Sequence, residues 1–248
     1  METDKLLKIL REDPPRAHQH APGGVWAAAR DCLEYLEKTL QEGWVTLETG
    51  CGASTAVFAA NGCKHTSVSL EEEEGEAVHG WCKKYGVDES QLDCIAGSSA
   101  EVLPKLAPTE LDLVFIDGCH AFPFPAVDWY YTARRLRVGG IMVVDDLQLP
   151  APDQVADFLR ADPRWTKLVD GEKWGAWRRE AVECVDEEWT SQPFFDTADH
   201  KARIKALRAA GELAPSHGPG KLNRRLYQLT HPKEALAALR RKLQPTQD

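Results

Sequence analysis

The sequence predicts an α/β fold in which a mostly parallel sheet lies between helices. Three stretches support this prediction. Residues 44–60 read as an apolar strand, a glycine turn and a helix. Residues 111–116 form a continuous apolar run, which is typical of a parallel strand buried on both faces, and an acid follows it. Residues 141–144 form another apolar strand, which also ends in acidic residues.

Composition limits the class of protein. A chain of 248 residues, 43% of them hydrophobic, fits one α/β domain with additions. No apolar run approaches the roughly 20 residues that span a bilayer, and the N-terminus lacks the apolar core of a signal peptide. The seven cysteines form no Cys-x-x-Cys pair, which predicts a reducing, cytoplasmic location. The net charge of −9 disfavours nucleic acid and favours a small-molecule substrate, with no membrane partner.

The elements follow in order from the N-terminus. Residues 1–24 are expected to form a loose arm that starts with a short helical stretch. Apolar residues then recur at helical spacing from Val25 to Leu40, so a helix precedes the first strand.

The glycine turn is the strongest ligand-binding signal. Gly50 and Gly52 allow a tight turn, and the following helix presents free amides above it. Glu48 would repel a pyrophosphate but attract an ammonium or sulfonium group, so the ligand should carry positive charge. A dinucleotide site requires a third glycine where this chain has Thr55, and a Gly-Lys-Ser/Thr phosphate loop is absent.

Two further predicted strands end in polar residues. The strand His65–Leu70 ends at Glu71, which lies 19 residues beyond Gly52, near the spacing expected for an acid that binds ribose hydroxyls. Glu71 could instead begin a solvated acidic helix. The strand Leu92–Ala96 closes on Gly97, Ser98 and Ser99, whose serines either contact the ligand or cap the helix expected over 100–106.

Acidic residues follow two predicted strands in the second half of the sheet. The strand at 111–116 leads to Asp117 and His120, and then to a rigid aromatic loop at 122–125 and a helix that runs to Leu136. Residues 137–140 are expected to turn the chain into the strand at 141–144, which ends in Asp145 and Asp146. A helix is expected at 152–159, and two strands at 165–169 and 174–177 look like a closing antiparallel hairpin.

These motifs carry a family resemblance. The stretch Glu48-Thr49-Gly50-Cys51-Gly52-Ala53-Ser54 resembles motif I of class I S-adenosylmethionine-dependent methyltransferases, with Ser54 in place of the last glycine. The pairing of Phe-Ile-Asp-Gly-x-His with Gly-Gly-x-x-Val-Val-Asp-Asp resembles the methyltransferase-24 group, which is similar to catechol-type and macrocin-type O-methyltransferases. The resemblance covers residues 25–180 and implies a Rossmann-like three-layer sandwich. Its sheet would have seven mostly parallel strands and a C-terminal antiparallel hairpin.

The resemblance implies S-adenosylmethionine as the cofactor. The residues expected to bind it are Glu48, Thr49, Gly50, Cys51, Gly52, Ser54, Glu71, Ser98, Ser99 and Asp117. His120 is the candidate base, because the ordinary pKa of histidine, about 6.5, suits proton abstraction near neutral pH. Asp117 either contacts the cofactor or, as a second catalytic residue, binds a metal together with Asp145 and Asp146. Three carboxylates at neighbouring strand ends would repel one another without a cation, and their hard oxygens suit Mg²⁺.

The leading hypothesis is O-methylation of a small hydroxylated molecule, a sugar or an aromatic. Alternatives are a metal-independent N-methyltransferase, a dinucleotide-dependent oxidoreductase, and a cofactor-binding protein whose tail docks a partner. Several aromatic residues either line an acceptor pocket or belong to the core, namely Phe122, Phe124, Trp129, Tyr130 and Trp189.

Residues 181–248 lie outside the family core and are expected to form a helical extension. It should contain a helix near 197–210, a Pro/Gly-rich break at 215–220, and a final helix with the basic end Arg240-Arg241-Lys242. The extension is expected to act as a substrate lid or a homodimer contact, or else to be a solvated appendage.

Overall fold

A computed structural model of the chain describes residues 3–18, 27–182, 194 and 198–210. The chain divides into two units, Met1–Phe194 and Phe195–Asp248. In the second unit the described part is a single helix, α8 (Ala198–Ala209), which confirms the helix expected near 197–210. Trp189, the break at 215–220 and the expected final helix lie outside the described residues.

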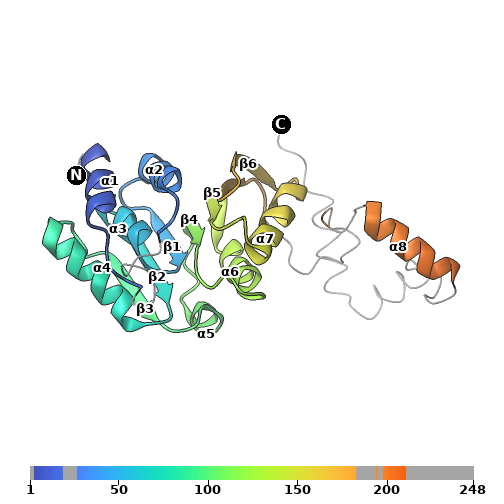
Figure 1. The fold of residues 1–248 in the computed structure, drawn as a ribbon, viewed down its shortest axis with the longest axis horizontal. Coiled ribbons are helices and arrows are strands. Elements are labelled where there is room, and N and C mark those ends of the chain that lie inside the picture. The colour runs from blue at the N-terminus through green and yellow to red at the C-terminus, as the bar shows by residue number, and fades with distance from the viewer. Residues whose placement is uncertain (1–2, 19–26, 183–193, 195–197, 211–248) are drawn as a thin grey trace, which may run out of the picture. The chain divides into compact units, whose positions relative to one another are not determined.

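The first unit is built on one seven-stranded sheet with the order β3-β2-β1-β4-β5-β7-β6 (Figure 1). The first five strands are parallel, whereas β7 runs antiparallel to both β5 and β6. This arrangement confirms the predicted sheet and its closing hairpin. The strands are β1 (Val45–Thr49), β2 (Lys64–Ser69), β3 (Leu92–Ala96), β4 (Leu111–Ile116), β5 (Leu136–Val144), β6 (Trp165–Asp170) and β7 (Gly175–Arg179).

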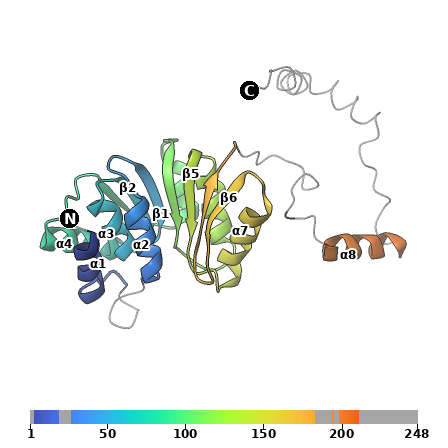
Figure 2. The ribbon, with the colours of Figure 1, turned by 90° about the horizontal axis from the view of Figure 1, so that it is seen from above.

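Helices cover both faces of this sheet and make it a three-layer sandwich (Figure 2). One layer holds α2, α3 and α4, and the other holds α5, the 3₁₀ turn η2, α6 and α7. The helices are α1 (Thr3–Glu12), α2 (Arg30–Thr39), α3 (Ala53–Ala60), α4 (Glu72–Tyr85), α5 (Ser99–Val102), η2 (Leu103–Lys105), α6 (Phe124–Ala133) and α7 (Pro150–Ala161).

Strand β4 shows why its sequence is apolar throughout. Successive side chains of a strand point to opposite faces. Leu113 and Phe115 join the core on the α3 side, and Val114 and Ile116 join the core on the α6 side. All four side chains are at most 3% exposed, so both faces of the strand require apolar residues.

The N-terminal segment differs from the expected loose arm. Helix α1 packs against α2 and α3, and Leu6 and Leu10 are 1% and 4% exposed in the same core as α3. Asp13, which follows α1, accepts hydrogen bonds from Lys84 and Tyr85 of α4, both at 2.5 Å. The segment is therefore a part of the domain, because its amphipathic helix covers apolar surface of the α3 layer.

The predicted turn at 137–140 is also wrong, since these residues belong to β5. Leu111 pairs with Leu136, but Leu113 pairs with Ile141, so β5 bulges between the two pairs. Gly139 has a φ of +84°, a backbone conformation that suits such a bulge. The helix expected from Val25 begins instead at Arg30, and Ala27–Ala29 precede it outside any helix or strand.

No helix among the residues that the structure describes is long and apolar enough to cross a bilayer.

Packing of α1 can be tested with Leu6→Ala. Removing a fully buried leucine side chain should lower the free energy of unfolding by about 2–5 kcal/mol, measured by urea denaturation. Lys5→Ala, one residue earlier and exposed, is the control and should change it by less than about 0.5 kcal/mol. Equal stability of the two variants would contradict the packed position of α1.

Candidate active site

A cavity of about 680 Å³ opens at the carboxyl ends of the parallel strands. Five segments that follow β1 to β5 line it, namely residues 49–54, 68–70, 97–99, 117–120 and 145–146. The order of the sheet reverses between β1 and β4, and ligands of open α/β sheets bind beyond the strand ends at such a switch point. The cavity is therefore the candidate active site.

Most of the residues predicted for the site line this cavity. These are Thr49, Gly50, Cys51, Gly52, Ser54, Ser98, Ser99, Asp117, His120, Asp145 and Asp146. Glu48 and Glu71 do not line it. Glu48 is completely buried beneath the glycine turn, and Glu71 is exposed at the N-cap of α4.

Glu48 holds the glycine turn from below. The Thr55 hydroxyl donates a hydrogen bond to Oε1 of Glu48 and accepts one from the Gly52 amide at 2.8 Å. Nε2 of His65 lies 3.1 Å from the same Glu48 oxygen, and Nδ1 of His65 lies 2.8 Å from the Thr46 hydroxyl. The acid of the motif thus connects the end of β1 to both β2 and the start of α3.

Gly50 is required by both its conformation and its surroundings. Its φ is +103°, which residues other than glycine rarely adopt. A Cβ atom built there would lie 2.4 Å from the carbonyl oxygen of Asp117. The turn after β1 therefore packs directly on the backbone that follows β4.

Asp117, His120 and Asp146 converge on one wall of the cavity. Nε2 of His120 lies 3.2 Å from Oδ2 of Asp146 and 3.6 Å from Oδ1 of Asp117. One potential ligand atom from each residue lies within 4.8 Å of the other two. The arrangement offers two carboxylates and an imidazole to a cation or to a substrate hydroxyl.

This group differs from the predicted trio of Asp117, Asp145 and Asp146. Asp146 has a φ of +55°, and Gln148 donates a hydrogen bond to its Oδ1 at 2.6 Å. Asp145, by contrast, is 5% exposed and does not belong to the group of converging atoms. The chain turns sharply at Asp146, so the carboxylates of the adjacent Asp145 and Asp146 point in different directions. The third member of the converging group is therefore His120 instead of Asp145.

The charged groups of the site shift one another's pKa values. Burial raises the pKa of Asp117 to about 7, although the interaction with the His120 ring opposes the rise. Burial likewise raises the pKa of Asp145 to about 6. The interaction with the Asp117 carboxylate raises the pKa of His120 above its ordinary value against the effect of burial, and the charge of Asp146 adds to the rise. An added positive charge would lower the pKa values of all three groups.

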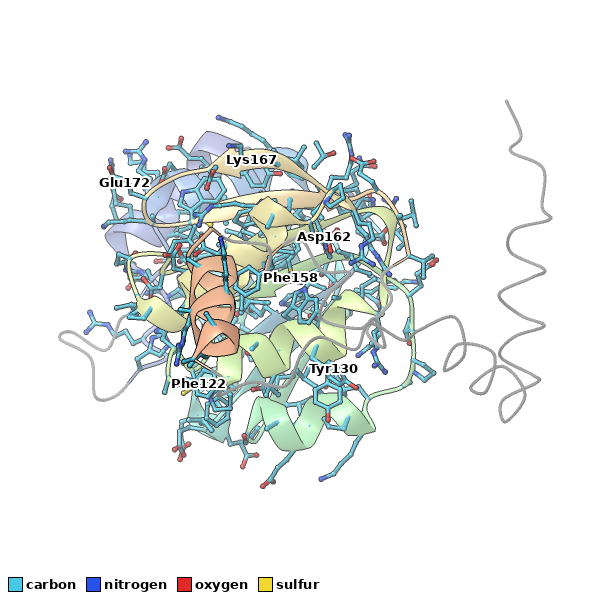
Figure 3. The ribbon with its side chains drawn as sticks, turned by 90° about the vertical axis from the view of Figure 1, so that its right-hand side faces the viewer. Phe122, Tyr130, Phe158, Asp162, Lys167 and Glu172 are labelled. Atoms are coloured by element: carbon cyan, nitrogen blue, oxygen red, sulfur yellow. The ribbon has the colours of Figure 1, made fainter. Side chains whose placement is uncertain are left out.

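The predicted aromatic residues divide between the site, the surface and the core. Phe124 lines the cavity, whereas Phe122 projects from the surface with 73% of its area exposed (Figure 3). The ring of Trp129 packs on Phe158 at 4.8 Å, and the Tyr130 hydroxyl accepts a hydrogen bond from Arg134. Of the described aromatic residues that were predicted, Phe124 alone lines the cavity.

Sequence reasoning missed His65 and Thr55 as parts of the site. His65 is 1% exposed, and its ring stacks on Phe58 at 4.1 Å. The position of His65 opposite Thr46 follows from the register of two strands, which the local sequence does not specify. The spacing of Thr55 three residues after Gly52 was the available signal, because a threonine there can bond the amide at the helix start.

The turn network can be tested with Thr55→Val. Valine has nearly the same shape but leaves both Oε1 of Glu48 and the Gly52 amide without the Thr55 hydroxyl. We expect the free energy of unfolding to fall by about 2–4 kcal/mol in chemical denaturation. Thr55→Ser keeps the hydroxyl and should cost about 1 kcal/mol or less. If the two variants were equally stable, the hydroxyl would contribute nothing to the turn.

Comparison with known proteins agrees with this architecture. Residues 47–147 match a family profile described as a methyltransferase domain. The chain is 31% identical over 186 residues to a Mycobacterium ulcerans protein named "Putative O-methyltransferase", covering 67% of this chain and 80% of that protein. A protein of the same name from Mycobacterium avium is 33% identical over 147 residues, covering 57% of this chain and 63% of the relative.

Solved structures share the fold at low identity. The O-methyltransferase NovP superposes with a TM-score of 0.57 at 14% identity, covering 72% of this chain and 98% of NovP. The methyltransferase PaMTH1 of Podospora anserina, solved with S-adenosylhomocysteine, gives 0.54 at 18% identity over 72% and 88% of the two chains. TomG of Streptomyces achromogenes, solved with S-adenosylmethionine, gives 0.54 at 16% identity over 72% and 89%. The chain belongs to the O-methyltransferase family and is an S-adenosylmethionine-dependent methyltransferase.

Proposed function

We propose that the protein methylates a hydroxyl group of a small molecule inside the 680 Å³ cavity. The observation that carries the proposal is the convergence of Asp117, His120 and Asp146 on the cavity wall. Methyl transfer requires donor and acceptor in line and, for a hydroxyl acceptor, a group that takes its proton. The cavity offers room for both molecules, and the converging group offers the proton acceptor.

The cavity suits a cationic cofactor. Four acids line it, Glu74, Asp117, Asp145 and Asp146, whereas Lys173 is the single lysine or arginine among the described lining residues. The glycine turn allows close approach of a ligand to its backbone, and Ser98 and Ser99 offer hydroxyls on the wall that follows β3. When bound, S-adenosylmethionine supplies the methyl group on a positively charged sulfur. We propose that residues 49–54 and 97–99 hold this cofactor, and that contact of Glu71 with the ribose requires its side chain to move.

His120 is the proposed base. Its Nε2 would take the proton of the acceptor hydroxyl as the oxygen bonds to the methyl carbon, and this nitrogen lies 3.6 Å from Oδ1 of Asp117 and 3.2 Å from Oδ2 of Asp146. The same carboxylates raise the pKa of His120 in the free protein and so favour its protonated form. A positive charge that neutralises them would lower the pKa of His120 and leave it free to accept a proton.

A divalent cation between Asp117 and Asp146 would supply that charge. Two carboxylates with open positions for water and an acceptor oxygen fit the way Mg²⁺ binds in many enzymes. A bound cation would also lower the pKa of the acceptor hydroxyl. We therefore propose Asp117 and Asp146 as the ligands and His120 as the base beside them.

His120→Ala tests the proposed base. We expect methyl transfer to fall by about 10²–10⁴-fold, measured with tritiated S-adenosylmethionine and an acceptor found in a panel of hydroxylated aromatics and sugars. Affinity for S-adenosylhomocysteine in calorimetry should change less than about threefold, because catalysis and cofactor binding use different groups. His79→Ala, which removes a histidine of α4 paired with Glu89, is the control. Full activity of His120→Ala would refute the role.

Asp146→Asn tests the proposed metal site. In calorimetric titration with MgCl₂ this variant should bind at least about tenfold more weakly than the unmodified protein. Asp145→Asn is the matched control and should change the affinity less than about threefold, since its carboxylate lies outside the converging group. Activity that survives EDTA, together with equal Mg²⁺ affinity of both variants, would favour the metal-independent N-methyltransferase.

A further inference from the structure

The N-terminal segment supplies a wall of the cavity that the proposed mechanism does not use. His18 lines the cavity, and so do Ala27–Ala29 further along the chain. All of these residues precede β1, so they belong to none of the segments that follow a strand of the sheet. The cavity is therefore bounded by the N-terminal part of the chain as well as by the five strand ends.

Asp13 anchors the segment that carries His18 to helix α4. Its backbone carbonyl accepts a hydrogen bond from Nε1 of Trp81 at 2.6 Å. Its Oδ2 accepts hydrogen bonds from Lys84 and Tyr85, both at 2.5 Å. The three donors are three and four positions apart, so they share one face of α4. Three bonds to one residue thus fix the point at which the chain leaving α1 meets α4.

The residues between Asp13 and His18 lie flat on the domain. Pro15 and Ala17 are buried, and Ala17 is only 2% exposed, whereas Arg16 between them is exposed. Alternate side chains of the segment therefore face the domain. This burial continues the attachment that begins at Asp13 as far as the residue before His18.

The segment runs along α4 towards the cavity. Lys84 lies in the last turn of α4, whereas Glu74 lies in its first turn and lines the cavity. The helix rises about 15 Å between these two residues, and the five residues that follow Asp13 span about 17 Å when extended. The anchored segment therefore brings His18 to the start of α4. Because α4 packs against β2 and β3, this is the β2–β3 end of the cavity.

The two ends of the cavity differ in their chemistry. Asp117, His120 and Asp146 follow β4 and β5, on one side of the switch point. Residues 68–70 and 97–99 follow β2 and β3, on the other side. The methyl group has to reach the acceptor at the end that holds the proposed base. Another arm of the sulfonium therefore extends towards the β2–β3 end.

The β2–β3 end suits the adenosyl arm of the cofactor. Leu70 lines the cavity and is 62% exposed, which offers apolar surface to a planar ring. Ser98 and Ser99 offer hydroxyls to its polar edge. The amino-acid arm carries a carboxylate, which Glu74 would repel. Burial lowers the pKa of His18 against the charge of Glu74, so its ring is mostly neutral near neutral pH and does not repel the sulfonium.

We propose that His18 is a cofactor-binding residue that contacts the adenosyl group of S-adenosylmethionine, and that Asp13 is a positioning residue that holds the His18 segment on α4. The inference rests on the proposed function, in which this cavity holds the cofactor. Asp13 does not line the cavity and acts through His18. The segment after α1 thus takes part in ligand binding as well as in the packing of the domain.

His18→Ala tests the contact. Its affinity for S-adenosylhomocysteine in calorimetry should fall at least about fivefold, because a polar or packing contact with the ligand is lost. Affinity for 5′-methylthioadenosine, which keeps the adenosyl group and lacks the amino-acid arm, should fall by the same factor. Arg16→Ala, an exposed neighbour in the same segment, is the control and should change either affinity less than about twofold.

Two results would contradict the role of His18. Parental affinity of His18→Ala for S-adenosylhomocysteine would overturn the contact itself. A loss confined to S-adenosylhomocysteine would overturn the assignment of His18 to the adenosyl group. Absence of binding by the parent protein would instead overturn the proposed function, and this inference with it.

A double-mutant cycle tests whether Asp13 acts through His18. Asp13→Ala should weaken binding of S-adenosylhomocysteine at least about threefold, whereas Asp13→Asn keeps an acceptor oxygen and should bind within about twofold of the parent. Added to His18→Ala, Asp13→Ala should cause no further loss. Additive losses, or a lower midpoint of thermal unfolding with unchanged affinity, would overturn the positioning role. If Asp13→Ala does not fold, Tyr85→Phe removes one donor to Asp13 and enters the same cycle.

Discussion

The hydrogen bond from the Thr55 hydroxyl to the buried Glu48 carboxylate stabilises the glycine turn, on which the geometry of the site depends. It joins α3 to β1 across the glycine turn, and Nε2 of His65 in β2 lies 3.1 Å from the same Glu48 oxygen. This glycine turn also packs on the backbone of Asp117, which leaves no room for a side chain at Gly50. A shift of Glu48 would therefore displace the turn and, with it, the backbone of Asp117. The glycine turn is held from beneath by Glu48, Thr55 and His65, which do not line the cavity.

Local patterns were enough to predict the sheet and most of the cavity. Apolar runs specify the strands, and the glycine turn and the acids mark the strand ends. Parallel strands bring those ends to one edge, so residues from Thr49 to Asp146 could be placed at one site without knowledge of distances. Glu48 was recognised as important, but its function as a support under the turn was not predicted. A sequence motif indicates which residues matter and leaves open whether they face the ligand or the core.

The predictions that failed depend on contacts between distant segments. Packing of α1 requires the surface of α3, and the bulge in β5 requires its register with β4. The convergence of His120 with Asp117 and Asp146 was not evident from the sequence either, because it depends on a positive φ at Asp146, which few sequences specify. His65 looked like an ordinary strand residue, because its partner Glu48 lies 17 positions away. Such residues are recognised only in the structure, where a polar side chain is found to be buried.

Electrostatics explains why so many acids can share this cavity. Burial raises the pKa values of Asp117 and Asp145 to about 7 and 6, which weakens the repulsion between neighbouring carboxylates. The interaction with Asp117 and the charges of Asp146 and Asp145 raise the pKa of His120 against the effect of burial. A nearby positive charge would favour the charged form of a carboxylate and disfavour the charged form of an imidazole. In the function that we propose, a cationic ligand would therefore lower the pKa of His120 and allow its ring to accept a proton.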